Sequence, residues 1–399
     1  MLLHHSYIFS QEDRFYGVVN SEGNRWQEQR RFALKTLRDL GFGRTKMEEI
    51  IKEELMDVCQ GLEAANGKFI NMDRRFNTPV ERTIFRVISN EPLNPNDPRL
   101  VTYHKNSELV FRHANKPWIS FIGFVPGGEQ LIRFMGLPTL TDFFNGHLDI
   151  IDEVIQKHKE TYQEDDIRDF TDAYLQKMDE AAKDTYSSFS GREGNLNLRN
   201  VLADLLRAGT DSTSVTISWS FLYMTNYPDV QKKVQDELDS VIGRGRLPEW
   251  SDRGNLPYTQ ATLLEVQRRA NIVPNGVPRR ARKDCHLGGF FIPADTIVFA
   301  ELGSVMLSPK LFPEPKKFKP ERFLVDGKFQ ASPYVIPFGS GKRRCIGETM
   351  SIVELFRFFT GILHQFHVEK RPEAVNPDAP GSGVLAMPDS FDLRFIPRN

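Results

Sequence analysis

Cysteine is scarce in this sequence and is not arranged in pairs. Only three occur among the 399 residues, at Cys59, Cys285 and Cys345, and none belongs to a CxxC motif. An odd number of widely spaced cysteines indicates neither a disulfide framework nor a zinc site. A reducing compartment fits this cysteine usage best.

An excess of charge of either sign is also missing. Lys and Arg total 52 and Asp and Glu total 53, which gives a net charge of -1 at pH 7. A nucleic-acid-binding protein normally carries a basic excess or a basic stripe, and this sequence has neither. We therefore expect no nucleic acid among its partners.

Long hydrophobic runs are absent as well. The opening segment MLLHHSYIF is too short and too polar to be a signal peptide or a membrane span. No later run reaches spanning length. The sequence as written is therefore expected to have no transmembrane anchor.

The most informative stretch is a glycine-punctuated loop that contains one cysteine. Residues 338–347 read FGSGKRRCIG and run directly into an apolar segment over residues 348–364. That segment has helical spacing, with apolar side chains at Ile352, Leu355, Phe356, Phe359 and Leu363. Cys345 therefore sits at a helix N-terminus, where partial positive charge and free N–H groups favour a thiolate.

A thiolate is a suitable ligand for heme iron. The glycines of the loop would let the backbone approach a flat cofactor closely. We interpret Cys345 as an iron ligand. The alternative is an ordinary buried cysteine, which is the commonest fate of a lone intracellular cysteine.

The loop matches the pattern FxxGxRxCxG, with Phe338, Arg343 and Cys345 at its side-chain positions. It closely resembles the heme-thiolate signature of the cytochrome P-450 superfamily. The resemblance implies a mainly α fold with small β sheets. It also implies that heme b lies between a long helix and this loop, with Cys345 as the metal ligand.

Other motifs of that family contribute candidate heme contacts. Trp26 and Arg30 form a WxxxR pattern on one face of a predicted helix. The resemblance implies that both contact a heme propionate, as does Arg279, which stands where relatives often carry histidine. Taken alone, WxxxR is a weak pattern that an amphipathic helix with a packed Trp and a solvated Arg also explains.

A long apolar helix is predicted over residues 198–227 and contains the stretch AGTDST at residues 208–213. The stretch resembles the family pattern (A/G)Gx(D/E)T(T/S). The resemblance implies that Asp211 delivers protons during oxygen activation, helped by the hydroxyl of Ser212 or of Thr213. Ser212 stands where the usual threonine would be. Alternatively, Gly209 is a helix–helix contact and the polar residues form a solvated strip.

Glu265 and Arg268 lie one helical turn apart, and Arg322 follows within the stretch PERF. An isolated pair of this spacing is usually a surface salt bridge of little worth. The family pattern places an arginine like Arg322 between this pair and the heme loop. The resemblance therefore implies a buried network of all three residues that supports the loop.

Apolar spacing and turn residues predict the remaining elements. The predicted helices cover residues 47–62, 78–89, 99–113, 156–184 and 256–270, and residues 187–197 read as a polar surface connector. A strand-turn-strand unit is expected over residues 288–299. Residues 384–387, before an alternating tail over residues 391–396, are interpreted as a β-turn or as part of a core-filling hairpin.

The motifs follow the family's order over residues 15–399. The most similar class is that of animal microsomal enzymes that oxidise steroids, fatty acids, terpenoids and foreign compounds. We expect a single heme-thiolate monooxygenase domain over residues 1–399. The resemblance also implies that this fold lacks the family's N-terminal anchor and its first sheet-and-helix segment.

The resemblance implies a monooxygenase that inserts one atom of O2 into a lipophilic substrate. Electrons would come from NADPH through an NADPH-cytochrome reductase, with cytochrome b5 as a further candidate donor. The implied location is the cytosolic face of the endoplasmic reticulum membrane. Two alternatives stay open, namely an electron-independent heme-thiolate isomerase or dehydratase and a truncated, non-catalytic heme-binding form.

Overall fold

The computed structural model describes residues 16–41, 45–114, 122, 127–372 and 385–398. The opening segment discussed above lies outside these residues. Contacts divide the chain into two compact units. The first unit is built from described residues within 16–62, 74–214 and 346–357, and the second from those within 63–73, 215–345 and 358–398.

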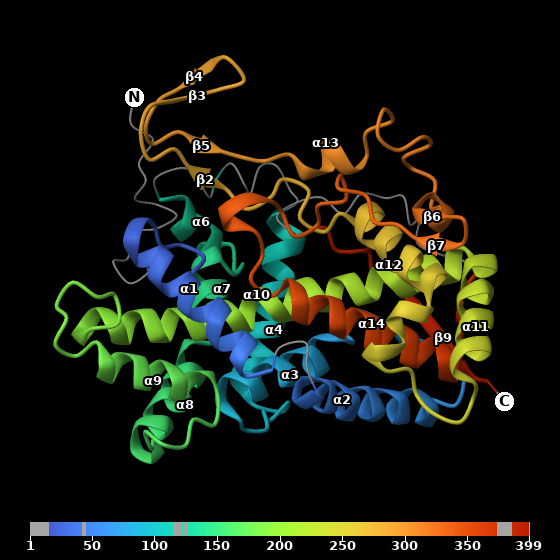
Figure 1. Cartoon of the computed structure of the whole chain (residues 1–399), viewed down its shortest axis with the longest axis horizontal. Coiled ribbons are helices and arrows are strands. Elements are labelled where there is room, and N and C mark those ends of the chain that lie inside the picture. Colours follow the sequence, from blue (N-terminus) through green and yellow to red (C-terminus); the bar gives the residue numbers. More distant parts are fainter. Residues whose placement is uncertain (1–15, 42–44, 115–121, 123–126, 373–384, 399) are drawn as a thin grey trace. The chain divides into compact units, whose positions relative to one another are not determined.

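The first unit is helical. It contains α1 (Gly23–Asp39), α2 (Thr45–Ala64), α3 (Asn77–Ser89), α4 (Pro98–Ala114), α6 (Gly128–Phe134), α7 (Leu140–Asn145), α8 (Leu148–Thr161) and α9 (Phe170–Glu180). The longest helix, α10 (Gly191–Asn226), and the later α14 (Glu348–Gln365) contribute residues to both units (Figure 1). The helices predicted for the positions of α2, α3 and α4 are confirmed.

Aromatic side chains hold α1 against α9 in the first unit. The ring of Phe32 lies 5.6 Å from Phe170, 5.1 Å from Tyr174 and 5.3 Å from Phe189, each in an edge-on geometry. Edge-on pairs of aromatic rings are stabilising beyond their buried area. The Tyr174 hydroxyl donates to Gln29 Oε1 at 2.8 Å, so the polar end of this cluster is also paired.

Two predictions about this region are wrong. Residues 156–184 do not form one helix, because α8 ends at Thr161 and a new helix begins after Asp169, whose carboxylate accepts the Asp172 N–H at 3.0 Å. Residues 187–197 are not only a connector, because α10 already begins at Gly191. Asn197 is buried and donates to the Ser188 carbonyl at 2.9 Å, so polar side chains there serve packing.

The second unit combines helices with short strands. Its helices are the end of α10, α11 (Pro228–Ile242), α12 (Pro257–Ala270), α13 (Leu302–Met306) and the end of α14, with 3-10 turns η2 (Trp250–Asn255), η3 (Pro320–Phe323) and η4 (Gly341–Arg343). Its strands are β1 (Ile70–Asn71), β2 (Arg279–Arg280), β3 (Cys285–Leu287), β4 (Phe290–Ile292), β5 (Ile297–Val298), β6 (Leu324–Val325), β7 (Lys328–Phe329), β8 (Phe366–Lys370) and β9 (Asp392–Pro397). The predicted mainly α fold with small β sheets is confirmed.

All pairings between these named strands are antiparallel. One sheet has the order β1-β9-β8, and the other three are the pairs β2-β5, β3-β4 and β6-β7. The predicted strand-turn-strand unit corresponds to β4 and β5, but each of these strands pairs with an earlier strand. The alternating tail forms most of β9, which pairs with β8 and β1.

Packing of the second unit centres on the end of α10. The Phe221 ring lies 6.1 Å from that of Phe359 on α14 and 6.0 Å from that of Phe395 on β9. Gln231 of α11 binds the backbone of Val368 on β8 twice, accepting from its N–H at 2.8 Å and donating to its carbonyl at 3.0 Å. Helices and sheet are therefore joined by both apolar and polar contacts.

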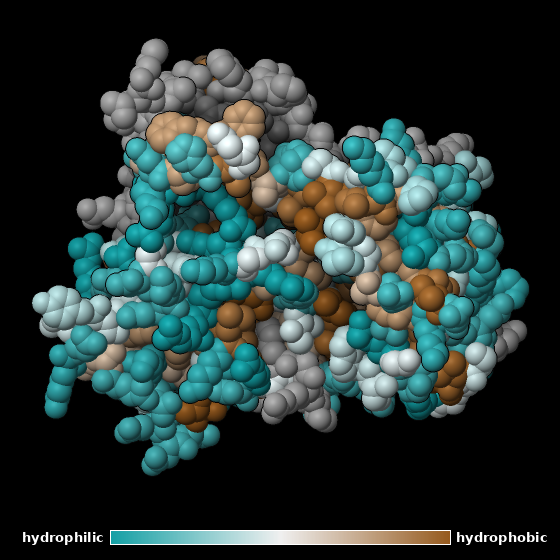
Figure 2. Space-filling model, turned by 45° about the horizontal axis from the view of Figure 1, so that its top comes forward, coloured by the Kyte–Doolittle hydropathy of each residue, from teal (hydrophilic) through white to brown (hydrophobic). Residues whose placement is uncertain are grey.

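Hydrophilic side chains cover most of the face drawn in Figure 2, where apolar side chains gather in separate patches. The β3–β4 hairpin also exposes large apolar side chains, namely Leu287, Phe290 and Phe291. Among the described residues, no helix combines the length and the hydropathy needed to cross a membrane.

The predicted network of Glu265, Arg268 and Arg322 is present in the second unit. Arg268 Nε and Nη2 donate to the two oxygens of Glu265 at 2.7 and 2.8 Å, and Arg322 Nε donates to Oε1 at 3.1 Å. Glu265 and Arg268 are fully buried. Arg268 also donates to the Met306 carbonyl at 2.8 Å, so the network ties α12 to the end of α13.

Glu265→Ala should lower the free energy of unfolding by about 3–5 kcal/mol, because it leaves buried arginine charge without its carboxylate. The matched control is Glu369→Ala, which removes the partly exposed partner of Arg394. That variant should lose less than about 1 kcal/mol. Urea denaturation of both variants checks the prediction, and equal losses would contradict it.

A second buried carboxylate joins helices of the first unit. Glu81 of α3 is hydrogen-bonded to His104 Nε2 at 2.9 Å and to His147 Nε2 at 2.8 Å. Burial alone would raise the pKa of Glu81, but the hydrogen bonds from His104 and His147 lower it to about 2. Burial in turn lowers the pKa of His147 below its ordinary value.

Because the folded-state pKa of Glu81 is depressed from 4.5 to about 2, its ionised form stabilises the fold above pH 4.5. This contribution, on the order of 3 kcal/mol, is lost as the pH falls through that interval. Glu81→Gln should therefore be destabilised at pH 7 and should approach the wild type near pH 2. Chemical unfolding at several pH values measures the difference, and a difference that does not depend on pH would refute this account.

Candidate functional site

The Cys345 loop belongs to the second unit. Gly339 and Gly341 have φ angles of +70° and +72°, in the left-handed region that favours glycine. The Cys345 N–H donates to the Phe338 carbonyl at 2.9 Å and closes the loop. The Cys345 side chain is exposed, whereas that of Cys59 is buried in α2.

The helix after the loop begins slightly later than Cys345. The first residue of α14 is Glu348, and the Ser351 N–H donates to the Gly347 carbonyl at 2.9 Å. Ile346 and Gly347 thus separate Cys345 from the first residue of α14, so Cys345 lies close before the helix N-terminus that the sequence predicts. The partial positive charge of that end favours an anionic sulfur.

The residues of the second unit fit a heme group. A Cβ placed on Gly339 or Gly341 would meet nothing within 4 Å, so the described residues leave space beside these two glycines of the loop that carries the exposed Cys345. Arg279 is exposed on β2, and its guanidinium has no hydrogen-bond or ion-pair partner among the described residues, so it could meet a propionate. Heme bound through Cys345 would supply the oxygen-activating redox chemistry.

Two further candidate heme contacts lie together on α1 in the first unit. The guanidinium carbon of Arg30 lies 5.8 Å from the centre of the Trp26 ring. The prediction that they share one helix face is therefore confirmed. Their contact with a propionate stays a prediction, as do the roles of Phe338 and Arg343.

Asp211 lies in the first unit and is buried. Its Oδ1 accepts from Arg74 Nη1 at 3.2 Å and from Asn77 Nδ2 at 2.9 Å. Its Oδ2 accepts from the Tyr103 hydroxyl at 3.2 Å and from the Ser107 hydroxyl at 3.1 Å. The carboxylate is therefore directed toward α4 and the start of α3.

The next two residues point elsewhere. The Ser212 hydroxyl donates to the Ala208 carbonyl one turn earlier on α10, at 2.6 Å. The Thr213 hydroxyl is buried and donates to Ser351 Oγ of α14 at 3.1 Å. The two candidate hydroxyls therefore have different acceptors, a carbonyl of α10 for Ser212 and a side chain of α14 for Thr213.

Gly209 of α10 packs against α3. A Cβ at this position would lie only 2.6 Å from Ile84 Cδ1. The alternative explanation of this glycine as a helix–helix contact is therefore supported. The glycine lets α10 approach α3 closely, which also brings Asp211 near Asn77.

Sequence reasoning missed the partners of Asp211. Arg74 and Ser107 precede it by 137 and 104 residues, and neither belongs to a recognisable motif. Only the folded arrangement of α4, α10 and the segment before α3 brings them together. Ser351, the partner of Thr213, was missed for the same reason.

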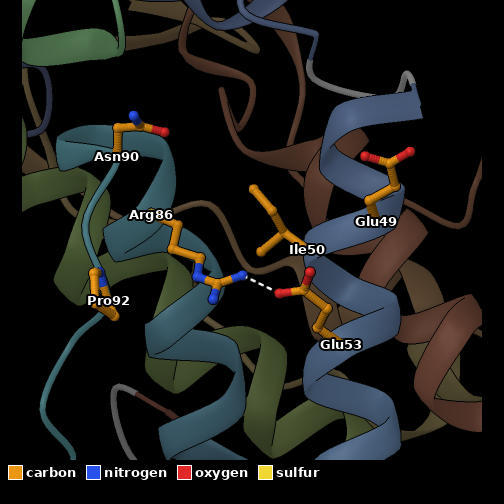
Figure 3. A pocket seen from close by; sticks show the side chains of 6 residues that line it. All are labelled: Glu49, Ile50, Glu53, Arg86, Asn90 and Pro92. Atoms are coloured by element: carbon orange, nitrogen blue, oxygen red, sulfur yellow. Dashed lines mark hydrogen bonds and ion pairs between the residues drawn. The ribbon is translucent and has the colours of Figure 1, made fainter.

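The first unit also has a surface hollow between α2 and α3. Its lining residues are Glu49, Ile50, Glu53, Arg86, Asn90 and Pro92 (Figure 3). Arg86 points across the hollow and pairs with Glu53. None of the predicted site residues lines this hollow, so it is a separate surface feature.

Similarity to known proteins identifies the family. The model of the family described as "Cytochrome P450" matches residues 3–395. The chain belongs to the cytochrome P450 family.

Named relatives support this assignment. The chain is 34% identical to cytochrome P450 2C1 of Oryctolagus cuniculus over 392 residues, which cover 96% of this chain and 78% of the relative. It is 35% identical to cytochrome P450 2J2 of Homo sapiens over 359 residues, which cover 88% of this chain and 69% of the relative. Membership implies a heme-thiolate monooxygenase with heme b as its cofactor.

Replacing Cys345 tests the metal ligand. Cys345→Ala should abolish the thiolate-type carbon monoxide band of the reduced protein, because no other exposed cysteine precedes a helix N-terminus among the described residues. Cys59→Ala and Cys285→Ala are matched controls and should keep the band. Optical spectra of the three variants check this, and an unchanged band in Cys345→Ala would exclude it as the ligand.

Proposed function

We propose that this chain inserts one atom of O2 into a lipophilic organic substrate, such as a steroid, fatty acid, terpenoid or foreign compound. The other oxygen atom leaves as water, and two electrons come from NADPH through a flavoprotein reductase. The observation that carries the proposal is the exposed Cys345 in an open glycine loop directly before α14. Cytochrome b5 is a second candidate electron donor.

The residues divide into a group that holds heme and a group that handles protons. Cys345 is assigned the iron, and Trp26, Arg30, Arg279 and Arg343 are assigned the propionates. Arginine suits this task because its guanidinium pairs bidentately with a carboxylate. Phe338, whose carbonyl accepts the Cys345 N–H, is assigned to the loop wall beside the cofactor.

Proton handling is assigned to α10. Ser212 Oγ is the proposed final donor, because Ser212 stands where the family pattern has its threonine, and its hydrogen bond to the Ala208 carbonyl holds the hydroxyl in one orientation on α10. We assign to Asp211 the resupply of protons to Ser212. We assign to Thr213 a structural role, because its hydroxyl binds Ser351 of α14. General acid–base assistance of this kind contributes about a hundredfold or more.

The cellular setting is also a proposal. We infer a single monooxygenase domain over residues 1–399 at the cytosolic face of the endoplasmic reticulum membrane. Lys342, Arg343 and Arg344 are exposed or partly exposed beside the Cys345 loop and offer positive charge to an acidic redox partner.

Turnover with purified reductase tests the proposal. The heme-loaded chain should consume NADPH and O2 in proportion to oxygenated product when a matching lipophilic compound is present. Such compounds can be found by screening for a change in the heme optical spectrum. Product formed without NADPH would instead indicate an isomerase or dehydratase. Heme binding without turnover of any compound that perturbs the spectrum would indicate a non-catalytic form.

Ser212 and Thr213 can be separated by mutation. Ser212→Ala should raise peroxide released per NADPH about tenfold or more, because the proposed final proton donor is lost. Ser212→Thr keeps the hydroxyl and should stay near the wild type. Thr213→Ala is the matched control. Peroxide assays that show loss of coupling only in Thr213→Ala would move the role by one residue.

A further inference from the structure

Arg74 lies at the centre of the hydrogen bonds around Asp211. Its Nη1 donates to Asp211, its Nη2 donates to Ser107 Oγ at 3.0 Å, and Ser107 in turn donates to Asp211. The three side chains therefore close a ring of hydrogen bonds. A ring of this kind constrains the orientation of each member more than a single bond would.

The ion pair at the centre of this ring is shielded from solvent. The side chains of Arg74 and Asp211 are only 11% and 6% exposed. Salt and water screen a pair so placed much less than a surface pair. The nearest further acid is Glu108, whose Oε2 lies 3.6 Å from Arg74 Nε.

The backbone of Arg74 shows that its position is demanding. Arg74 has a φ angle of +52°, which is uncommon for a residue with a side chain. Such a conformation is energetically unfavourable and persists where surrounding interactions compensate it. The bonds to Asp211 and Ser107 are interactions of that kind.

The other donors complete the surroundings of Asp211. Burial raises the pKa of Tyr103 well above its ordinary value, so its phenol keeps its proton and donates. Asn77 donates to the same oxygen as Arg74. Each carboxylate oxygen thus accepts two hydrogen bonds, which is about the capacity of an ionised carboxylate.

We propose that Arg74 and Ser107 are positioning residues for the reaction, which hold the Asp211 carboxylate in one orientation on α10. The inference rests on the proton role proposed for Asp211 above. Asn77 and Tyr103 each bind one oxygen only, so without Arg74 the ring opens and the hydroxyl of Ser107 loses the donor that orients it. A lysine at position 74 keeps the charge but lacks the fork that binds Asp211 and Ser107 together.

The infrared carboxylate stretch of Asp211 tests the positioning directly. It is measured in the heme-loaded chain with isotope-labelled aspartate, and the band is assigned by its absence in Asp211→Asn. The band should shift in Arg74→Met and shift less in Arg74→Lys. Arg86→Met removes an α3 arginine that pairs with Glu53 at the surface, and it should leave the band unchanged.

The functional measurement is the coupling of NADPH consumption to product formation. Arg74→Met should raise peroxide released per NADPH about tenfold and change the solvent isotope effect on NADPH consumption, whereas Arg74→Lys should recover most of the coupling. If Arg74→Met does not fold, Ser107→Ala serves in its place and should give a band shift and a rise of about threefold.

Three results would overturn the inference, and they are distinguishable. An Asp211 band that is unchanged in both Arg74→Met and Ser107→Ala shows that these residues do not position the carboxylate. A shifted band with normal coupling, while Asp211→Asn uncouples, shows that the positioning has no role in the reaction. Normal coupling in Asp211→Asn contradicts the proton role of Asp211 itself.

Discussion

Three buried carboxylates of this protein have hydrogen-bond donors on both of their oxygens, and each connects separate segments of the fold. Glu265 is surrounded by Arg268 and Arg322, Glu81 by two histidines, and Asp211 by donors from α3, α4 and the segment before α3. Removing an ion from water is costly, and paired arrangements of this kind offset the cost. Each carboxylate therefore dictates which segments must meet.

On α10, the hydrogen bonds that stabilise the fold involve the same residues as the proposed proton transfer. Successive residues of a helix point about 100° apart, so three neighbours can serve three purposes. Asp211 faces α4 and the start of α3, Ser212 bonds back to its own helix, and Thr213 reaches α14. Gly209 permits the close approach to α3 that brings the Asp211 carboxylate to Asn77. One turn of helix thus carries packing, positioning and the candidate proton donor.

The sequence predicted those features that depend on local pattern. The glycine loop at Cys345, the α1 face with Trp26 and Arg30, and the network around Glu265 all follow from short motifs, and the structure contains each of them. The early start of α10 was missed because its first turns are polar and are held by tertiary hydrogen bonds such as that of Asn197.

The partners of Asp211 could not be predicted for a different reason. Arg74 and Ser107 lie more than a hundred residues before it, and single polar residues in a turn or a helix have no spacing that reveals a distant partner. The break between α8 and α9 depends on a single capping residue, Asp169, inside a stretch with helical spacing. Local patterns therefore defined the class of the site, whereas long-range contacts decided how its residues are held.

The central claim is that Cys345 alone provides the sulfur ligand of heme iron. The most direct test uses the Cys59→Ser/Cys285→Ser double variant, in which Cys345 is the only cysteine left. The variant is expressed with cysteine that carries a heavy sulfur isotope and is then loaded with heme. Its iron–sulfur stretch is recorded by resonance Raman spectroscopy. The account predicts a band that shifts to lower frequency with the heavy isotope. A spectrum with no isotope-sensitive band would contradict it.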